Sequence, residues 1–170
     1  MQPLALIVVV LCVITVLHGF VTFALIARFR AYQERTALVP RDPDLPAPGD
    51  RVQPFEATSA AGALLTADTL ASGATLVGFF TPHCKPCELA RENLVSKPPT
   101  LPMVAFINGS ADDAACQQIG ETLGAVAQVA YTARNETVAR AFRQAGYPTF
   151  IRVENGKVAA SSHNLRDVMA

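Results

Sequence analysis

The chain has 170 residues, with 14 basic and 14 acidic side chains, so its formal net charge is zero. Arginine outnumbers lysine eleven to three, and these cations are scattered except in residues 28–41. Because there is neither a basic excess nor a lysine cluster, the composition gives no indication of a nucleic-acid partner. The length allows one globular domain preceded by a membrane anchor.

The first predicted element is an N-terminal transmembrane anchor at residues 1–30. Its core, residues 4–27, has no formally charged side chain, and Cys12 and His18 are its only ionisable groups. About 20 apolar residues cross the hydrocarbon core of a bilayer, whereas a cleavable signal peptide has an apolar core of about 7–15 residues behind a basic segment. We therefore expect residues 4–27 to span the lipid bilayer as an anchor.

A stalk and proline-rich linker is predicted at residues 31–50. Four prolines fall within nine residues, at Pro40, Pro43, Pro46 and Pro48. Such a stretch favours extended polyproline geometry, at about 3.1 Å per residue, and would form a stiff spacer of roughly 28 Å. The spacer would hold the domain predicted at residues 51–170 away from the bilayer.

Residues 51–170 alternate between strand and helix signals. Strands are predicted at 55–58, 63–65, 75–80, 103–108, 126–131, 149–153 and 157–160. Helices are predicted at 88–94, after a cap at Ser110 or Asp112, and from a cap at Asn135 through Gln144. Asn155-Gly156 is a signal for the turn of a β-hairpin. This alternation, ending in a hairpin, predicts an α/β fold with a mixed sheet and helices on both faces.

The sequence Cys84-Lys85-Pro86-Cys87 lies where a predicted strand ends and a predicted helix begins. At a helix N-terminus, unpaired amides and the positive end of the dipole favour a thiolate, which is the nucleophilic form of cysteine. Lys85 and a protonated His83 would lower the pKa of Cys84 further, and Pro86 would stiffen the first turn. We predict a redox dithiol; the alternatives are a static disulfide or half of a metal site.

Three motifs, in this order along the chain, resemble the thioredoxin superfamily. They are Pro48-Gly49-Asp50 leading to Pro54-Phe55, then Phe79-Phe80-Thr81-Pro82-His83-Cys84-Lys85-Pro86-Cys87, then Val138-Ala139-Arg140-Ala141-Phe142 leading to Tyr147-Pro148-Thr149-Phe150. With the apolar N-terminal segment, they resemble the membrane-anchored TlpA-like (MauD-type) thiol–disulfide oxidoreductases. The resemblance implies a thioredoxin-like mixed sheet flanked by helices and preceded by one transmembrane helix.

The resemblance also implies roles for the site residues. Cys84 would attack a partner disulfide and Cys87 would resolve the mixed disulfide, so that the Cys84–Cys87 disulfide is the redox group and no other cofactor or metal is needed. Pro148 would be a cis-proline beside the dithiol and would leave the Tyr147 backbone free to pair with a client strand. Clients would be exported proteins with disulfides, as in cytochrome c or amine dehydrogenase maturation, and a membrane thiol carrier would supply electrons. The motif leaves open whether the protein acts as a reductant or an oxidant.

Two positions depart from the thioredoxin pattern. Gly78 stands where thioredoxins carry a buried carboxylate, and His83 stands where they carry a tryptophan. We also expect the C-terminal helix to be short or absent. Cys116 is predicted to be a buried thiol on a helix; the alternative is a regulatory or third redox thiol. His163 is predicted to be a solvated residue after the last strand.

Two other functions fit parts of the sequence. Thr81 and Cys84 have the T-x-x-C spacing of a thiol peroxidase, although Val77 stands where that family has a proline. Cys84, Cys87 and His163 could bind copper in a chaperone of the same fold, because thiolates and imidazole suit that metal. That family, however, separates its cysteines by three residues and not two.

Two arguments about the orientation in the membrane conflict. No Lys or Arg precedes the apolar segment, whereas four arginines follow it, at Arg28, Arg30, Arg35 and Arg41. By the positive-inside rule, this bias places the domain in the cytoplasm. The cytosol, however, is already buffered by soluble reductants, whereas outside it a tethered dithiol enzyme supplies a redox activity that is otherwise absent. The resemblance also indicates the outer face. We expect a single-pass protein of the cell membrane with an extracytoplasmic catalytic domain.

Overall fold

The computed structural model describes residues 45–132 and 136–169, together with positions 11, 15, 17–19 and 22. The chain divides into two units, Met1–Arg41 and Asp42–Ala170. Most of the predicted anchor, the arginines that follow it and the predicted Asn135 cap lie outside the described residues. Among the residues that are described, no helix is both long enough and apolar enough to cross a membrane.

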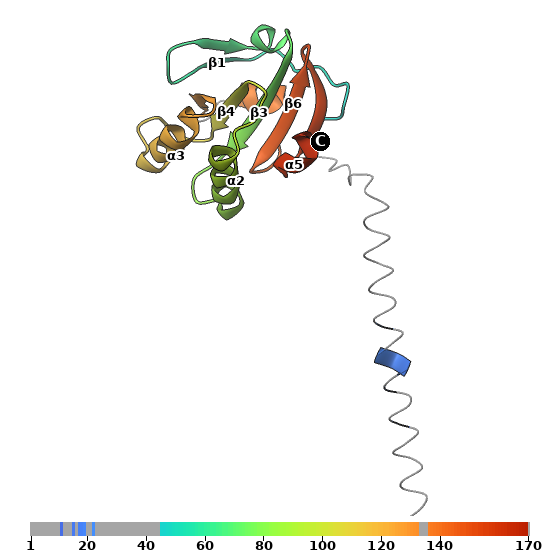
Figure 1. Cartoon of the computed structure of the whole chain (residues 1–170). Helices are drawn as coiled ribbons and strands as arrows, with labels where there is room; N and C mark the ends of the chain where they lie inside the picture. Colours follow the sequence, from blue (N-terminus) through green and yellow to red (C-terminus); the bar gives the residue numbers. More distant parts are fainter. Residues whose placement is uncertain are drawn as a thin grey trace, which may run out of the picture. The chain divides into compact units, whose positions relative to one another are not determined.

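A five-stranded mixed sheet forms the centre of the second unit (Figure 1). Its strands are β3 (Ala74–Phe80), β4 (Met103–Ile107), β5 (Gln128–Tyr131), β6 (Thr149–Glu154) and β7 (Lys157–Ser162), in the order β5-β4-β3-β6-β7. Strands β3, β4 and β5 run parallel, while β6 and β7 are antiparallel to their neighbours. The central position therefore belongs to β3, the strand that leads to the two cysteines.

Side chains of β3 point alternately to the two faces of the sheet, as the period of a strand requires. Leu76 and Phe80 belong to a core beneath three helices, α2 (Lys85–Ser96), α3 (Ala114–Gly124) and α5 (Leu165–Met169). Val77 and Phe79 face the other core, which contains an aromatic cluster of Phe55, Phe79, Phe106 and Phe142. This second core is covered by α4 (Glu136–Ala141), the 3-10 turn η1 (Asp68–Leu70) and a two-stranded sheet of β1 (Glu56–Thr58) and β2 (Leu64–Thr66).

The predicted mixed α/β sheet is confirmed, and the seven predicted strands are found within about two residues of their expected bounds. The hairpin between β6 and β7 turns at Asn155 and Gly156, whose φ angles are 52° and 74°. Both angles are positive, as a tight turn of the favoured hairpin type requires. The C-terminal helix is present but has only five residues.

Two predicted helix boundaries are wrong. Asp113, and neither Ser110 nor Asp112, caps α3, because its Oδ1 accepts hydrogen bonds from the amides of Ala115 and Cys116 at 2.8 and 3.2 Å. Helix α4 ends at Ala141, three residues before Gln144.

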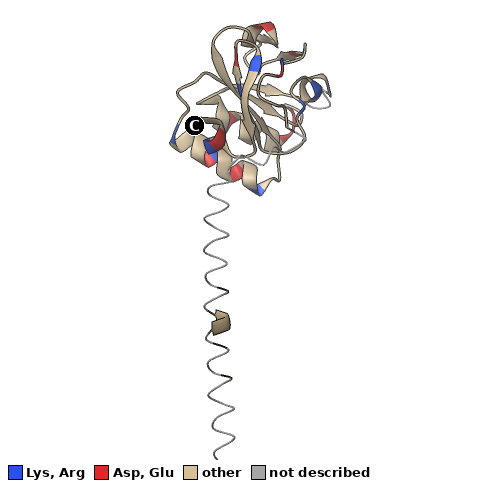
Figure 2. Cartoon of the chain, turned by 90° about the vertical axis from the view of Figure 1, so that its right-hand side faces the viewer, with Lys and Arg blue, Asp and Glu red and all other residues tan. Residues whose placement is uncertain are grey.

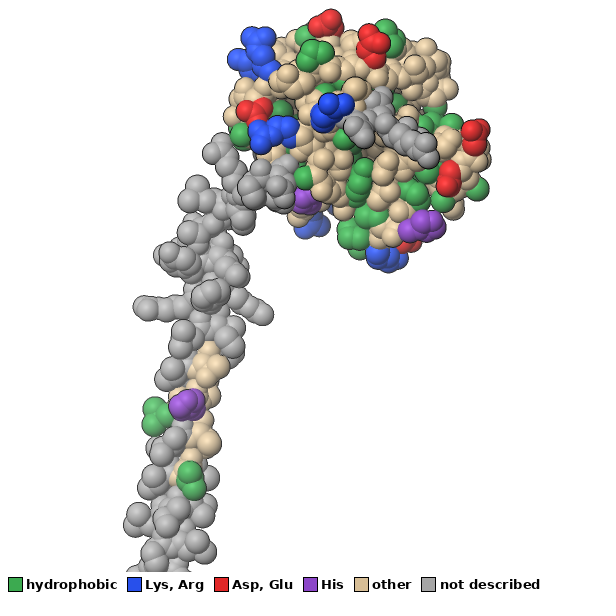
Figure 3. Space-filling model, turned by 180° about the vertical axis from the view of Figure 1, so that it is seen from behind, with side chains coloured by type: hydrophobic (Ala, Val, Ile, Leu, Met, Phe, Trp, Pro, Cys, Tyr) green, Lys and Arg blue, Asp and Glu red, His purple; other side chains and the backbone are tan. Residues whose placement is uncertain are grey.

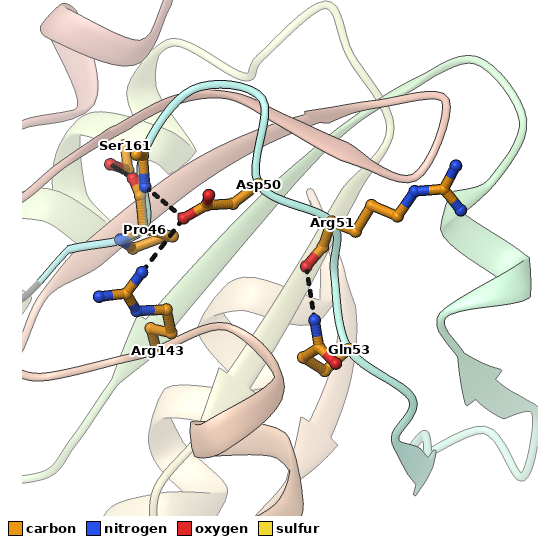
Figure 4. A network of polar contacts seen from close by, with 7 residues as sticks. Pro46, Asp50, Arg51, Gln53, Arg143 and Ser161 are labelled. Atoms are coloured by element: carbon orange, nitrogen blue, oxygen red, sulfur yellow. Dashed lines mark hydrogen bonds and ion pairs between the residues drawn. The ribbon is translucent and has the colours of Figure 1, made fainter.

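The last residues of the predicted linker pack on the folded unit (Figure 4). Ser161 Oγ donates to the carbonyl oxygen of Pro46 at 2.7 Å. Asp50 Oδ2 accepts from the amide of Ala47 at 2.9 Å and lies 3.3 Å from Arg143 Nη1. The fold therefore begins several residues before position 51, at a segment that these contacts hold against β7.

Charged residues lie mainly on helices, turns and strand ends of the folded unit, whereas most of the sheet is uncharged (Figure 2). On the face drawn in Figure 3, neither sign forms a continuous patch.

Candidate active site

Cys84 occupies the N-cap position of α2, directly after the loop that follows β3. Its backbone is extended, with φ −114° and ψ 104°, and its Sγ accepts from the amide of Cys87 at 3.3 Å. The sulfur therefore takes the place that a Ser or Asp oxygen commonly fills at a helix N-terminus. Pro86 lies in the first turn, where an amide has no helical partner. This position favours a negatively charged sulfur through the amide and the dipole.

Cys84 and Cys87 form a disulfide, with their Cα atoms 5.2 Å apart. Cys84 is partly exposed, whereas Cys87 is fully buried in the core beneath α2. An incoming thiol or disulfide can thus reach Cys84 from solvent and cannot reach Cys87 directly. This asymmetry agrees with the predicted order, in which Cys84 attacks and Cys87 resolves.

Cys84 also lines a surface cleft of about 840 Å³ between α2 and α3. Besides Cys84, its wall includes His83, Arg91 and Val95 on one side, and Gln118 and Thr122 on α3. His83 is exposed and has a positive φ of 58°. The cleft gives solvent and small thiols a route to the sulfur of Cys84.

Lys85 is not the uncompensated cation that the sequence suggested. Its Nζ lies 2.8 Å from Glu88 Oε2, one helical turn along α2. The hydrogen bond to Glu88 and the charge of that carboxylate raise the pKa of Lys85, and the same pairing lowers the pKa of Glu88. Both groups therefore stay charged at neutral pH, and the negative charge of Glu88 opposes the effect of Lys85 on the pKa of Cys84.

The loop before β6 brings Tyr147 and Pro148 to the dithiol. The register pairs Phe79 of β3 with Thr149 of β6, so the end of β3 and the start of β6 lie side by side. The Tyr147–Pro148 bond is cis, as the resemblance implied, and Pro148 is buried. The carbonyl oxygen of Tyr147 lies 3.8 Å from Cys84 Sγ, and partial burial raises the pKa of the Tyr147 hydroxyl.

Gly78 leaves no room for the carboxylate that thioredoxins carry at this strand position. A Cβ atom there would lie 2.8 Å from Met103 Cε and 2.8 Å from Phe80 Cε2. The thioether of Met103 and the ring of Phe80 thus occupy the space. Cys87 belongs to a core cluster of hydrophobic side chains, and no carboxylate is buried among the described residues.

Cys116 is fully buried on α3, as predicted, and its burial raises the pKa of its thiol, with a smaller contribution from the Asp113 carboxylate. A buried thiol with a raised pKa is a poor nucleophile. Residues 45–132 and 136–169 contain no group of three His, Cys, Asp or Glu side chains that could hold a metal ion.

His163 is exposed and directly follows β7, as predicted, but the sequence did not reveal its contacts with the loop before β6. The side chain is exposed, but Nδ1 lies 2.7 Å from the carbonyl oxygen of Pro148 and 3.3 Å from Thr149 Oγ1. The residue therefore contacts the loop that carries Tyr147. The β6–β7 hairpin brings positions 148 and 163 together, so a local sequence motif does not predict the contact.

We predict that Glu88→Gln lowers the pKa of the reduced Cys84 thiol. The change removes the negative charge paired with Lys85, and less negative charge near a thiolate favours that thiolate. Because the pKa of Glu88 is already lowered, the wild-type carboxylate is charged across the whole range in which a thiol titrates. The rate of Cys84 alkylation against pH, read by peptide mass spectrometry, reports the shift. Glu56→Gln, on β1, is a control for loss of one surface charge; an unchanged or raised Cys84 pKa in Glu88→Gln would refute this electrostatic account.

Several solved structures share the fold of this chain. The thioredoxin domain of a thiol-disulfide oxidoreductase from Bacteroides vulgatus aligns with a TM-score of 0.60 and 15% identity, over 73% of this chain and 94% of that one. A thiol:disulfide interchange protein from Bacteroides sp. aligns with a TM-score of 0.58 and 16% identity, over 74% of this chain and 87% of that one. A secreted Mycobacterium tuberculosis disulfide oxidoreductase is described as homologous to E. coli DsbE. It aligns with a TM-score of 0.54 and 18% identity, over 68% of this chain and 87% of that one. No protein-family model matches the sequence, and no curated protein matches it significantly. The chain therefore has a thioredoxin-like fold.

Proposed function

We propose that the protein is a membrane-anchored thiol–disulfide oxidoreductase that reduces or isomerises disulfides in exported client proteins. The observation that carries this proposal is the asymmetric Cys84–Cys87 pair, with a partly exposed cysteine at the N-cap of α2 and a fully buried partner three residues later. The neighbouring Tyr147 carbonyl, 3.8 Å from Cys84 Sγ, lies where a bound client chain would meet the dithiol. The solved structures with this fold include proteins described as thiol–disulfide oxidoreductases.

In the reducing direction, the Cys84 thiolate attacks one sulfur of the client disulfide. The client disulfide breaks, a Cys84–client disulfide forms, and the first client sulfur leaves as a thiolate. Cys87 then attacks the Cys84 sulfur and releases the second client sulfur, so the protein dithiol becomes a disulfide while the client gains two electrons. The client takes one proton from Cys87 and the second from solvent, because Cys84 reacted as a thiolate. With no carboxylate at Gly78, the departing client thiolate is the base that takes the Cys87 proton.

Regeneration of the dithiol needs a second dithiol donor, and we assign this role to a membrane thiol carrier. Its sulfur would attack the exposed Cys84 of the Cys84–Cys87 disulfide, since Cys87 is out of reach. The TlpA-like resemblance suggests clients of cytochrome c or amine dehydrogenase maturation. A domain held near the bilayer by residues 4–27 and a proline-rich linker would meet both the carrier and newly exported chains.

We predict that Cys87→Ser accumulates mixed disulfides with client proteins, whereas Cys84→Ser does not. Without Cys87, the Cys84–client disulfide has no internal thiol to open it. Non-reducing electrophoresis of the variant isolated from its native host, followed by mass spectrometry of the trapped partners, measures this. Cys116→Ser, which changes the buried thiol, is the matched control and should behave as wild type. Equal trapping by Cys84→Ser and Cys87→Ser would contradict the assigned order.

We predict that the catalytic domain lies on the outer face of the cell membrane. A membrane-impermeant maleimide, applied to intact cells after mild reduction, should label Cys84 in a Cys116→Ser background. Peptide mass spectrometry separates Cys84 from the other cysteines. Labelling that occurs only after lysis would place the domain in the cytoplasm, in agreement with the arginine bias, and would exclude exported clients.

A further inference from the structure

His163 follows β7 and lies against the loop that presents Tyr147 to the dithiol. Its Nδ1 atom is 2.7 Å from the carbonyl oxygen of Pro148 and 3.3 Å from Thr149 Oγ1. The imidazole also lies close to Gly146, where a Cβ atom would be only 3.0 Å from His163 Cε1. The absence of a side chain at Gly146 therefore lets the ring approach the loop backbone.

The chemistry of the contacts settles which ring nitrogen carries a proton. A carbonyl oxygen only accepts hydrogen bonds, so at 2.7 Å from Pro148 O the Nδ1 atom of His163 must be a donor. Thr149 Oγ1 uses its own hydrogen for the carbonyl of Gly146, at 2.7 Å, and can only accept from His163. The neutral Nδ1–H ring and the imidazolium both supply this donor, so either form keeps the contact.

Several hydrogen bonds hold the segment 146–149. The Gly146 carbonyl accepts from both Thr149 Oγ1 and Gln144 Nε2, the latter at 2.6 Å. His163 adds the bond to Pro148 from a different part of the chain, 15 residues away. Tyr147 lies between these fixed points, and its carbonyl faces Cys84.

We propose that His163 is a positioning residue for client recognition: it fixes the 146–149 loop so that the Tyr147 backbone meets a client polypeptide at the correct distance from Cys84. This inference rests on the proposed oxidoreductase function. Among the contacts of the described residues, none joins His163 to the sulfur of Cys84 or Cys87. His163 therefore acts through the loop. It should therefore affect binding of a polypeptide disulfide, and should leave the reactivity of the dithiol toward a small thiol unchanged.

The test compares His163→Ala, His163→Asn and His163→Gln in the full chain in detergent. Asn places an amide donor near the position of Nδ1, whereas the longer Gln places it near Nε2. The substrate is a synthetic peptide with one disulfide, and dithiothreitol supplies electrons. Reduction of the Cys84–Cys87 disulfide by dithiothreitol alone is measured separately. Amide hydrogen exchange is measured at Gly146, Tyr147 and Thr149, since Pro148 has no amide hydrogen.

For His163→Ala we expect KM for the peptide to rise about five- to tenfold, the effect of one lost hydrogen bond, with kcat within about twofold of wild type. His163→Asn should restore KM, His163→Gln should not, and exchange of the loop should be faster in Ala and Gln only. An unchanged KM in Ala, no rescue by Asn, or an equal slowing of the dithiothreitol reaction would overturn the proposal. A wild-type protein that fails to reduce the peptide would refute the proposed reductase activity and, with it, the client role of His163; loop exchange would still show whether His163 holds the segment.

Discussion

The site depends on the position of one sulfur at the first turn of α2. A helix N-terminus leaves amides without partners, and here the amide of Cys87 points at Cys84 Sγ from 3.3 Å. Cys87 follows Cys84 by three residues, less than one helical turn, and its side chain faces the core. The same turn of α2 therefore buries Cys87. One short segment thus produces both the exposed nucleophile and the protected resolving thiol.

The sheet brings a distant part of the chain to the dithiol. Its central strand, β3, ends at the dithiol, and the antiparallel pairing of β3 with β6 brings a loop 63 residues away in sequence to Cys84. The parallel partner β4 places Met103 beside Gly78, which fills the strand position of the thioredoxin carboxylate with apolar atoms. The fold therefore places the Tyr147 backbone beside Cys84, while apolar atoms fill the strand position next to the core that contains Cys87.

Much of this arrangement could be predicted from local sequence. The apolar run before Cys84 and the proline after it indicate a strand and a helix start, and Asn155-Gly156 indicates a hairpin because it tolerates two positive φ angles. The cap of α3 could not be chosen, since Ser110, Asp112 and Asp113 are all suitable residue types and only backbone geometry selects among them.

The contacts that modify the site were less accessible to sequence reasoning. Lys85 and Glu88 have helical i, i+3 spacing, so their ion pair could have been found by checking the partners of each charge. The contact of His163 with Pro148 depends on the register of β6 and β7, and no spacing rule yields it. The anchor and the orientation stay predictions of the sequence, because the residues concerned lie largely outside those that the structure describes.

The central claim, that Cys84 and Cys87 are a reversible redox pair and not a static cross-link, is tested most directly by an equilibrium titration. The full chain is incubated in glutathione buffers of known potential, quenched with acid, and the dithiol and disulfide forms are counted by mass spectrometry. We expect a reversible two-electron transition with a midpoint between about −270 and −120 mV, the range of redox-active pairs on this fold. A pair that stays oxidised in every buffer, with a potential below about −300 mV as in structural disulfides, would contradict the account.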